Sequence, residues 1–290
     1  MVTTKIAKKE RRAFTGDMLA SAHKYQNLQN LPHWHDETEI VFVVSGNAQL
    51  LCDNENYELK SGEVALISSG EVHFIKGDAS SIISVIKIDE ELVKRSVGNL
   101  RLNCPILTEK FDIEQVYEKI IFEHNSYDEL SQAVINASVT LLLAQIYRTH
   151  ECVEKLSETE SENAQNKRIF AYISANFGTV TFKEVATLSG FSEPYFSQYF
   201  KRISGMTFTK YLNSLRVIEA IKRLSEKKKS VTEISIECGF GTIRNFNRVF
   251  KEITGYSPKS LPSKFSISVA IKDSANMDFD PTLSTTIILQ

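Results

Sequence analysis

The sequence predicts an α+β protein with a small N-terminal β-barrel, a helical hairpin, and an all-α domain of two helix-turn-helix units joined by a long helix. Residues 31–88 hold short β-branched segments separated by Gly, Asn and Ser, which is typical of strands joined by turns. From residue 109 the apolar residues recur with helical spacing. Residues 165–262 contain an internal repeat and carry 16 Lys and Arg against 7 Asp and Glu, whereas residues 1–164 carry 16 against 26. The basic half therefore favours a polyanionic partner.

The bulk composition is that of a globular protein of two domains, since 290 residues exceed what one core usually supports. The sequence has no stretch of about 20 apolar residues, so we expect no membrane partner. The basic residues 1–12 are not followed by an apolar segment, which argues against a secretion signal. The four cysteines are scattered and form no C-x-x-C pair. Zinc-finger and redox functions are therefore disfavoured, and a cytoplasmic location with reduced thiols is expected.

The barrel is expected over residues 1–108 because four strand-like segments follow one another without an intervening helix. These segments are ETEIVFVVSG (37–46), AQLLC (48–52), YELKSGEVALISSG (57–70) and SIISVIKI (81–88). Turns are expected at residues 45–47 and 53–56, where Asn, Asp, Ser and Gly gather.

The hairpin is expected over residues 109–150, where two amphipathic helices follow one another. Apolar residues in the first recur at helical spacing from Ile113 to Ile121, and residues 130–150 form a longer and more apolar helix. Both apolar stripes need a cover, which is either the barrel or a second copy of the chain. We expect a homodimer formed through this hairpin.

The remaining boundaries follow from composition. Residues 151–166 are polar and acidic and are expected to be a linker before a basic domain over residues 167–262. The tail, residues 263–290, alternates apolar residues from Phe265 to Ile271, which predicts an added strand of unknown role.

Each copy of the repeat predicts a helix-turn-helix unit. In the first, residues 182–188 form a helix, Gly190 supplies the turn, and Ser192 with Pro194 begins a second helix. In the second, Thr242 is the expected N-cap. Phenylalanines at i and i+4 form the buried side of each second helix, and a long helix from Tyr211 to Leu224 joins the units. If the units lie about 34 Å apart, both second helices reach successive major grooves of DNA.

The opposite sides of these two helices are polar and basic, as base-edge recognition requires. The first exposes Pro194, Ser197, Gln198 and Lys201, and the second exposes Ile243, Arg244, Asn247, Arg248 and Lys251. Arg can bond guanine and Asn can bond adenine in bidentate fashion, so the second helix carries the richer chemistry.

At these residues the chain resembles the AraC family of bacterial transcription regulators. Gly239-Phe240, Phe250-Lys251 and Gly255-Tyr256-Ser257-Pro258 are similar to the family signature G-F-x(9)-F-K-x(3)-G-x-S-P. The resemblance implies sequence-specific binding to double-stranded DNA and adds Tyr195 to the first reading face. It also implies activation more often than repression, and RNA polymerase as a further candidate partner.

The barrel carries a candidate metal or effector site. His33, His35 and Glu39 share a parity, so on a regular strand their side chains share a face. H-x-H-x(3)-E-x(6)-G (33–46) and G-x(5)-S-x-G-x(2)-H (62–73) resemble the two cupin motifs, which implies a cupin-like barrel and adds His73. Three imidazoles and a carboxylate suit Fe, Mn or Zn. The same four residues could instead line an effector pocket without any metal, and the sequence requires no cofactor.

The function predicted is a transcription regulator that responds to a small molecule, with a sugar favoured by the family resemblance alone. Its rival is a cupin metalloenzyme, an isomerase or dioxygenase, with an appended nucleic-acid-binding domain. No second acid–base pair is evident in the barrel, so an enzyme is disfavoured and no catalytic residue is assigned. A further rival is an architectural binder without sequence preference, which would show only the salt dependence of phosphate contacts.

Overall fold

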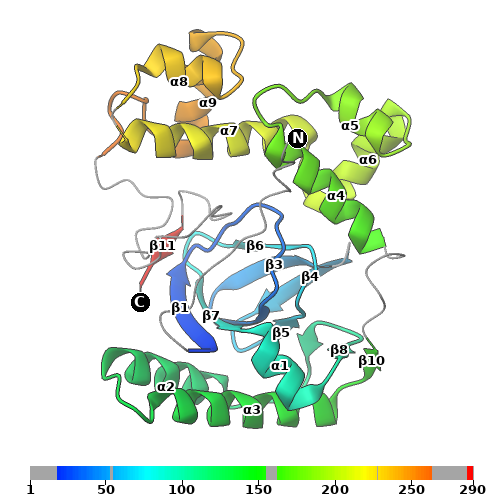
Figure 1. The fold of residues 1–290 in the computed structure, drawn as a ribbon, viewed down its shortest axis with the longest axis vertical. Helices are drawn as coiled ribbons and strands as arrows, with labels where there is room; N and C mark the ends of the chain where they lie inside the picture. The colour runs from blue at the N-terminus through cyan, green and yellow to red at the C-terminus, as the bar shows by residue number, and fades with distance from the viewer. Residues whose placement is uncertain (1–17, 53–54, 155–161, 227, 263–285, 290) are drawn as a thin grey trace, which may run out of the picture.

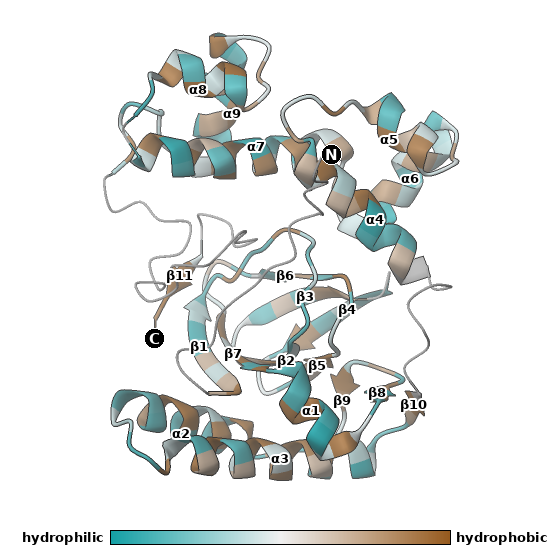
Figure 2. Cartoon of the chain, viewed as in Figure 1, coloured by the Kyte–Doolittle hydropathy of each residue, from teal (hydrophilic) through white to brown (hydrophobic). Residues whose placement is uncertain are grey.

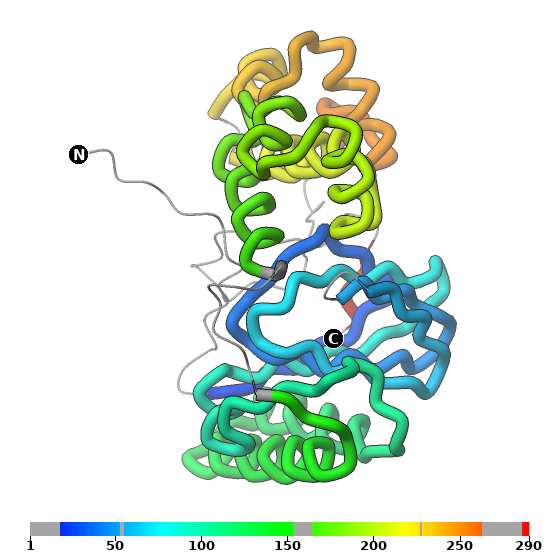
Figure 3. The backbone as a smooth tube through the Cα atoms, turned by 90° about the vertical axis from the view of Figure 1, so that its right-hand side faces the viewer, coloured from blue at the N-terminus to red at the C-terminus, as the bar shows by residue number. Residues whose placement is uncertain are grey.

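The computed structural model describes residues 18–52, 55–154, 162–226, 228–262 and 286–289. Figure 1 shows three layers, with the α2–α3 hairpin at one end, the barrel in the middle and the helical domain at the other end. Figure 3 shows the same stacking from the side. The predicted α+β class and the order of its parts are confirmed.

The strands form a barrel around one of the hydrophobic cores. They are β1 (Ala20–Gln26), β2 (Thr38–Ser45), β3 (Asn47–Cys52), β4 (Glu55–Lys60), β5 (Val64–Ile67), β6 (His73–Gly77), β7 (Ile82–Ile88), β8 (Leu100–Leu102), β9 (Ile106–Leu107), β10 (Cys152–Glu154) and β11 (Ile287–Ile288). One sheet has the order β11-β1-β7-β2-β5-β9 and faces a second of order β4-β3-β6, while β10 pairs with β8. Alternate residues such as Val41, Leu50 and Val85 point inward and are buried, as the period of two requires.

The hairpin covers the outer face of the larger sheet. It consists of α2 (Ile113–Asn125) and α3 (Ser131–Thr149). The short helix α1 (Glu90–Val97) packs beside α3. Tyr117 of α2 and Val139 of α3 are fully buried in one core with Ile40 and Ile86 of the sheet. The barrel therefore supplies the cover for the buried stripe of each helix.

The helical domain holds the two expected units on one connecting helix. Its helices are α4 (Glu162–Ala175), α5 (Phe182–Leu188), α6 (Glu193–Ser204), α7 (Phe208–Ser225), α8 (Val231–Glu237) and α9 (Ile243–Thr254). Helix α7 runs between the α5–α6 pair and the α8–α9 pair (Figure 1). In Figure 2 teal and brown residues alternate along α2, α3 and α7, as expected of helices with one buried face.

Three expectations need correction. Residues 151–166 are not a linker throughout, because 152–154 form β10 against β8 and α4 begins at Glu162. The tail does add a strand, but at Ile287–Ile288 beside β1, and the alternating residues 265–271 lie outside the described residues. The segment from His33 to Glu39 is not one regular strand, because a bend at residues 36–37 precedes β2.

Candidate functional site

The first helix-turn-helix unit is built from local signals. Thr181 and Glu184 form a capping box at the start of α5, and Gly190 in the following turn has φ +72°. Helix α6 then begins after the N-cap Ser192 with proline in its first turn. Phe196 is fully buried behind it. The predicted turn, the predicted start of α6 and its predicted buried side are therefore confirmed.

The outward face of α6 is open. All five residues predicted to contact DNA from this helix are exposed: Pro194, Tyr195, Ser197, Gln198 and Lys201. The ring of Tyr195 is 53% exposed and packs edge-on against Phe191, with centroids 4.7 Å apart. This aromatic contact holds a large side chain on the reading face.

The second unit repeats the design. Ser230 and Glu233 form its capping box, and the Thr242 side chain accepts a hydrogen bond from the Asn245 backbone N–H at the start of α9. The predicted contact residues are again all exposed: Ile243, Arg244, Asn247, Arg248 and Lys251. The Arg248 guanidinium donates to Glu252 at 2.9 Å and to the Asn245 side chain at 3.0 Å, so it lies along the exposed face of α9.

The connecting helix contacts both units, and the units also touch each other directly. The Arg216 side chain of α7 donates to the Phe177 carbonyl of the first unit at 2.8 Å, and its guanidinium lies 5.9 Å from the Phe240 ring of the second. The backbone of Gly178 lies so close to Gly239 that a Cβ added there would be 2.1 Å from the Gly178 carbonyl oxygen. These contacts fix the relative placement of the two reading helices.

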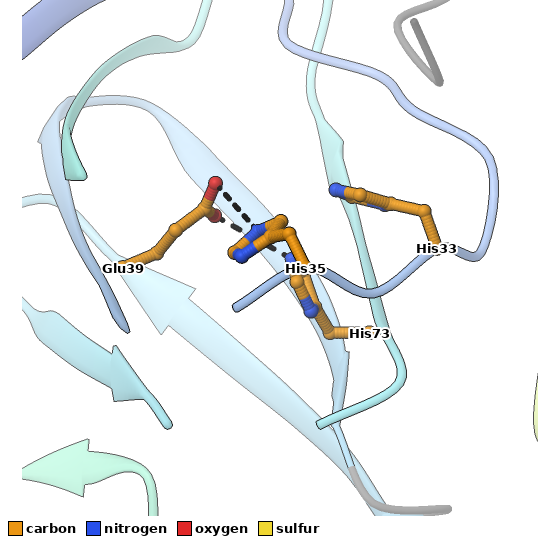
Figure 4. A group of neighbouring side chains, drawn as sticks. All are labelled: His33, His35, Glu39 and His73. Atoms are coloured by element: carbon orange, nitrogen blue, oxygen red, sulfur yellow. Dashed lines mark ion pairs between the residues drawn. The ribbon is translucent and has the colours of Figure 1, made fainter. Parts of the chain in front are cut away.

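The four predicted barrel residues come together in a buried cluster, despite the bend that interrupts the expected strand. One ligand atom from each of His33, His35, Glu39 and His73 lies within 4.8 Å of the others. All four side chains are at most 5% exposed. Figure 4 shows the three imidazoles and the carboxylate converging. We call these residues the histidine–glutamate cluster.

Backbone carbonyls set the tautomer of all three histidines. The Nδ1 atoms of His33, His35 and His73 lie 2.8, 2.9 and 2.9 Å from the carbonyls of residues 31, 37 and 71, respectively. A carbonyl only accepts, so each Nδ1 carries the proton and each Nε2 keeps its lone pair in the neutral ring. Metal-binding histidines are commonly oriented by the same kind of contact.

The Nε2 atoms then face a carboxylate. The Glu39 carboxylate oxygens lie 3.0 Å from Nε2 of His35 and 3.5 Å from Nε2 of His73. A lone pair and a carboxylate oxygen at such distances repel each other unless a proton or cation lies between them. The donor set therefore fits a divalent metal, with a coordinating carboxylate and three imidazoles.

Lys87 is a member of the site that sequence reasoning missed. Its ammonium lies 2.7 Å from Glu39, and both side chains are buried. Burial alone would raise the pKa of Glu39, but the Lys87 ammonium, and after it the attraction of His35 and hydrogen bonds donated by His35 and His73 when a proton lies on Nε2, hold that pKa well below its usual range. A signal existed, because Lys87 shares the parity of the inward residues Ile83 and Val85.

A polar cavity of about 120 Å³ lies in the same domain, and its lining contains none of the four cluster residues. It is lined in part by Tyr57, Ser68, Glu71, Arg101 and Asn103. The side chain of Glu71 accepts from the Ser68 backbone N–H at 2.9 Å, while its own carbonyl holds Nδ1 of His73. One residue thus links the cavity to the cluster.

The other three histidines lie outside the cluster and make structural contacts. Nε2 of His124 lies 3.1 Å from the Ala20 carbonyl and joins α2 to β1, and Nε2 of His150 accepts from the Thr108 backbone N–H at 3.0 Å. His23 lies on β1 with its ring centroid 6.1 Å from that of Tyr25.

Two family models match the chain. One, described as an AraC-like ligand binding domain, matches residues 16–105, and the other, described as a helix-turn-helix domain, matches residues 185–262. Within the described residues, no helix has both the length and the apolar character that crossing a bilayer requires.

Curated relatives match across both parts. An uncharacterized HTH-type transcriptional regulator of Staphylococcus aureus is 23% identical over 231 residues, which cover 76% of this chain and 30% of that protein. The chain therefore spans about a third of that relative's length. The HTH-type transcriptional activator RhaS of Klebsiella pneumoniae (strain 342) is 24% identical over 247 residues, covering 79% of this chain and 86% of RhaS.

Solved structures show more distant likeness. The structure of unsaturated fatty acid bound ToxT from Vibrio cholerae strain SCE256 has a TM-score of 0.42 and 13% identity, covering 86% of this chain and 95% of that one. The DNA-binding domain of AdpA in complex with a target DNA has a TM-score of 0.32 and 22% identity, covering 33% and 87%.

Proposed function

Because the chain belongs to the AraC family of transcriptional regulators, we propose that it reads specific DNA sequences through α6 and α9 and changes transcription when its barrel binds a small molecule. The observation that carries this proposal is the pair of exposed polar faces on helices whose separation is fixed by α7 and by the Gly178–Gly239 contact. A fixed separation between two exposed helices is required when both must enter successive grooves of one DNA duplex. The family is one of regulators rather than enzymes.

Selection of bound fragments from genomic DNA by the purified full chain tests the proposal. A sequence-specific reader enriches a small set of fragments that share a two-part motif, with half-sites about one helical turn apart. Uniform recovery, with only a salt-dependent affinity, would support an architectural binder instead.

Arg248→Ala should weaken binding to the enriched fragment by about 1–3 kcal/mol, because a bidentate contact to a base is lost. It should also relax the preference for one base pair of the second half-site. Titration of labelled fragments, with substitutions at each position, measures both effects. Lys222→Ala is the control, since Lys222 is an exposed cation on α7 outside both reading faces. Equal losses in the two variants would mean that Arg248 contacts only phosphate.

Three finer parts of the proposed function are the direction of regulation, the effector class and the location. Activation is favoured by the similarity to RhaS, which is a transcriptional activator, and implies contact with RNA polymerase. A sugar is a suitable effector class, because the polar cavity is lined by hydroxyl, amide, carboxylate and guanidinium groups that can bond hydroxyls. A DNA-binding regulator of this kind works in the cytoplasm.

We also propose that the histidine–glutamate cluster binds one divalent transition metal. The support is the set of three imidazoles and one buried carboxylate whose ligand atoms lie within 4.8 Å of one another, with Nε2 of His35 and of His73 3.0 and 3.5 Å from Glu39 oxygens. A bound ion would supply positive charge and Lewis acidity at the centre of the sensing domain. His35→Ala should abolish stoichiometric binding of Zn²⁺ or Co²⁺, measured by calorimetry and by the visible spectrum of the cobalt form.

His23→Ala is the matched control for metal binding, because it removes a histidine of the same domain that lies outside the cluster. It should bind the metal as the parent does. A parent protein that binds no metal, or a His35→Ala variant that binds as tightly as the parent, would leave the cluster as the lining of an effector site.

The hairpin is the proposed dimer surface. Phe122 of α2 and Leu130 and Leu141 near and on α3 are 61–68% exposed, although the opposite sides of both helices are buried against the barrel. Leu141→Asp should therefore raise the dimer dissociation constant at least tenfold, as sedimentation velocity over a concentration series would show. Ser225→Asp, at the exposed end of α7, is the control. A parent chain that sediments as a monomer at high concentration would contradict the dimer.

A further inference from the structure

Two short segments that carry the three histidines of the cluster also contact the first helix-turn-helix unit. We call residues 30–35 and 70–75 the rim ribbon. The backbones of His33 and His73 exchange hydrogen bonds of 3.1 and 3.0 Å, and the Gly70 N–H donates to the His35 carbonyl at 2.8 Å. The two segments are therefore joined by a bridge at His33 and His73 and by the flanking backbone bond at Gly70.

Other side chains of the rim ribbon pack into the helical domain. Leu31 and Val72 are at most 3% exposed and belong to the same hydrophobic core as Phe170 and Phe200 of the first unit. The Lys167 ammonium of α4 lies 4.6 Å from the Trp34 ring centroid. Burial of this kind is typical of a stable contact rather than of a passing one.

The same contact reaches the end of the first reading helix. Gly205 is the C-cap of α6 with φ +66°, and the Phe74 ring lies against it so closely that a Cβ at residue 205 would be 2.4 Å from the ring. Phe74 follows His73 directly, so one residue of the ribbon points to the cluster and its neighbour supports the reading helix. Figure 3 shows this end of the helical domain seated on the barrel.

We propose that the rim ribbon couples the occupant of the histidine–glutamate cluster to the docking of the first helix-turn-helix unit. The inference rests on the metal site proposed above. Ligand atoms that already lie within 4.8 Å of one another need only a small shift to meet Zn²⁺ at about 2.0–2.1 Å. A bound ion would thus hold the rim ribbon in its docked geometry. The ratio of the ion's affinities for the docked and undocked states sets how far the docking equilibrium shifts.

Coupling between two sites is reciprocal, and this gives a test from the helical side. If the metal strengthens docking, then a substitution that disrupts docking must weaken the metal. Gly205→Ala drives a methyl group into the Phe74 ring, while Gly255→Ala alters the equivalent C-cap of α9, where φ is +77° and nothing lies within 4 Å. The pair separates loss of docking from backbone strain at a left-handed residue.

The experiment uses the full chain and Zn²⁺ alone as the probe. In the parent, Zn²⁺ should increase hydrogen-exchange protection in residues 30–35 and 70–75 and in α4 and α7. Gly205→Ala should lose protection at these places and bind Zn²⁺ at least about fivefold more weakly, the lower end of typical coupling between sites. Gly255→Ala should match the parent in both respects. If Gly205→Ala does not fold, Lys167→Glu tests the same contact from α4.

The outcomes are distinguishable. Weaker zinc binding in the docking variant alone supports the coupling. If Gly205→Ala loses protection of the rim ribbon but keeps the parent's zinc affinity, the coupling is overturned and the metal site stands. If Gly255→Ala loses as much zinc affinity as Gly205→Ala, the coupling is also overturned and the metal site stands. A parent that binds no zinc overturns the metal site first and the coupling with it.

Discussion

Lys87→Met should lower the free energy of unfolding of the metal-free protein by about 3–5 kcal/mol, the usual effect of removing one partner of a buried ion pair. The Lys87 ammonium lies 2.7 Å from Glu39, and both groups are shielded from water. Methionine keeps most of the volume but leaves the carboxylate with a charge that nearby imidazoles only partly offset. Urea denaturation in the presence of a chelator measures the loss.

Zinc should reverse this loss. In the parent a bound ion competes with the ammonium for Glu39, whereas in Lys87→Met the carboxylate is free to bind the ion, so added Zn²⁺ should stabilise the variant more than the parent. Lys76→Met, an exposed lysine on β6, is the control and should change stability little. A Lys87→Met variant as stable as the parent without metal would show that the ammonium does not balance Glu39.

The helical units could be predicted in detail because their signals are local. Capping residues, a glycine with positive φ and phenylalanines at i and i+4 each act within one turn of the chain, and each occurs twice. The structure places Gly190, Thr242 and the buried phenylalanines as predicted, and adds the capping box of Thr181. The exposed reading faces follow from the same periodicity.

The barrel site was predicted only in part, because its geometry depends on distant residues. The parity of His33, His35 and Glu39 indicated one face, yet the chain bends at residues 36–37. The side chains meet because His33 pairs with His73, which lies forty residues further along the chain. Lys87 comes from a strand some fifty residues away. The contact of Phe74 with Gly205 joins residues of two domains, and no local pattern encodes such a pairing.

Gly239→Ala should lower the free energy of unfolding of the helical domain by about 2–5 kcal/mol. A left-handed backbone at a residue other than glycine costs about 1–2 kcal/mol, and overpacking adds about 1–3 kcal/mol. The second contribution is expected because the new methyl group would lie 2.1 Å from the Gly178 carbonyl oxygen, so one unit must move away from the other. Chemical denaturation followed by circular dichroism measures the effect.

The same substitution should weaken binding to a two-half-site DNA fragment at least tenfold while sparing binding to a single half-site. Two readers at a fixed separation bind as one rigid body, and looser units lose the effective concentration that this spacing provides. Gly190→Ala is the matched control, because Gly190 lies at the equivalent turn with φ +72° and nothing within 4 Å. It should show the strain alone. If the two variants lose equal affinity for the paired site, the contact between Gly178 and Gly239 does not set the spacing, and α7 alone holds the readers apart.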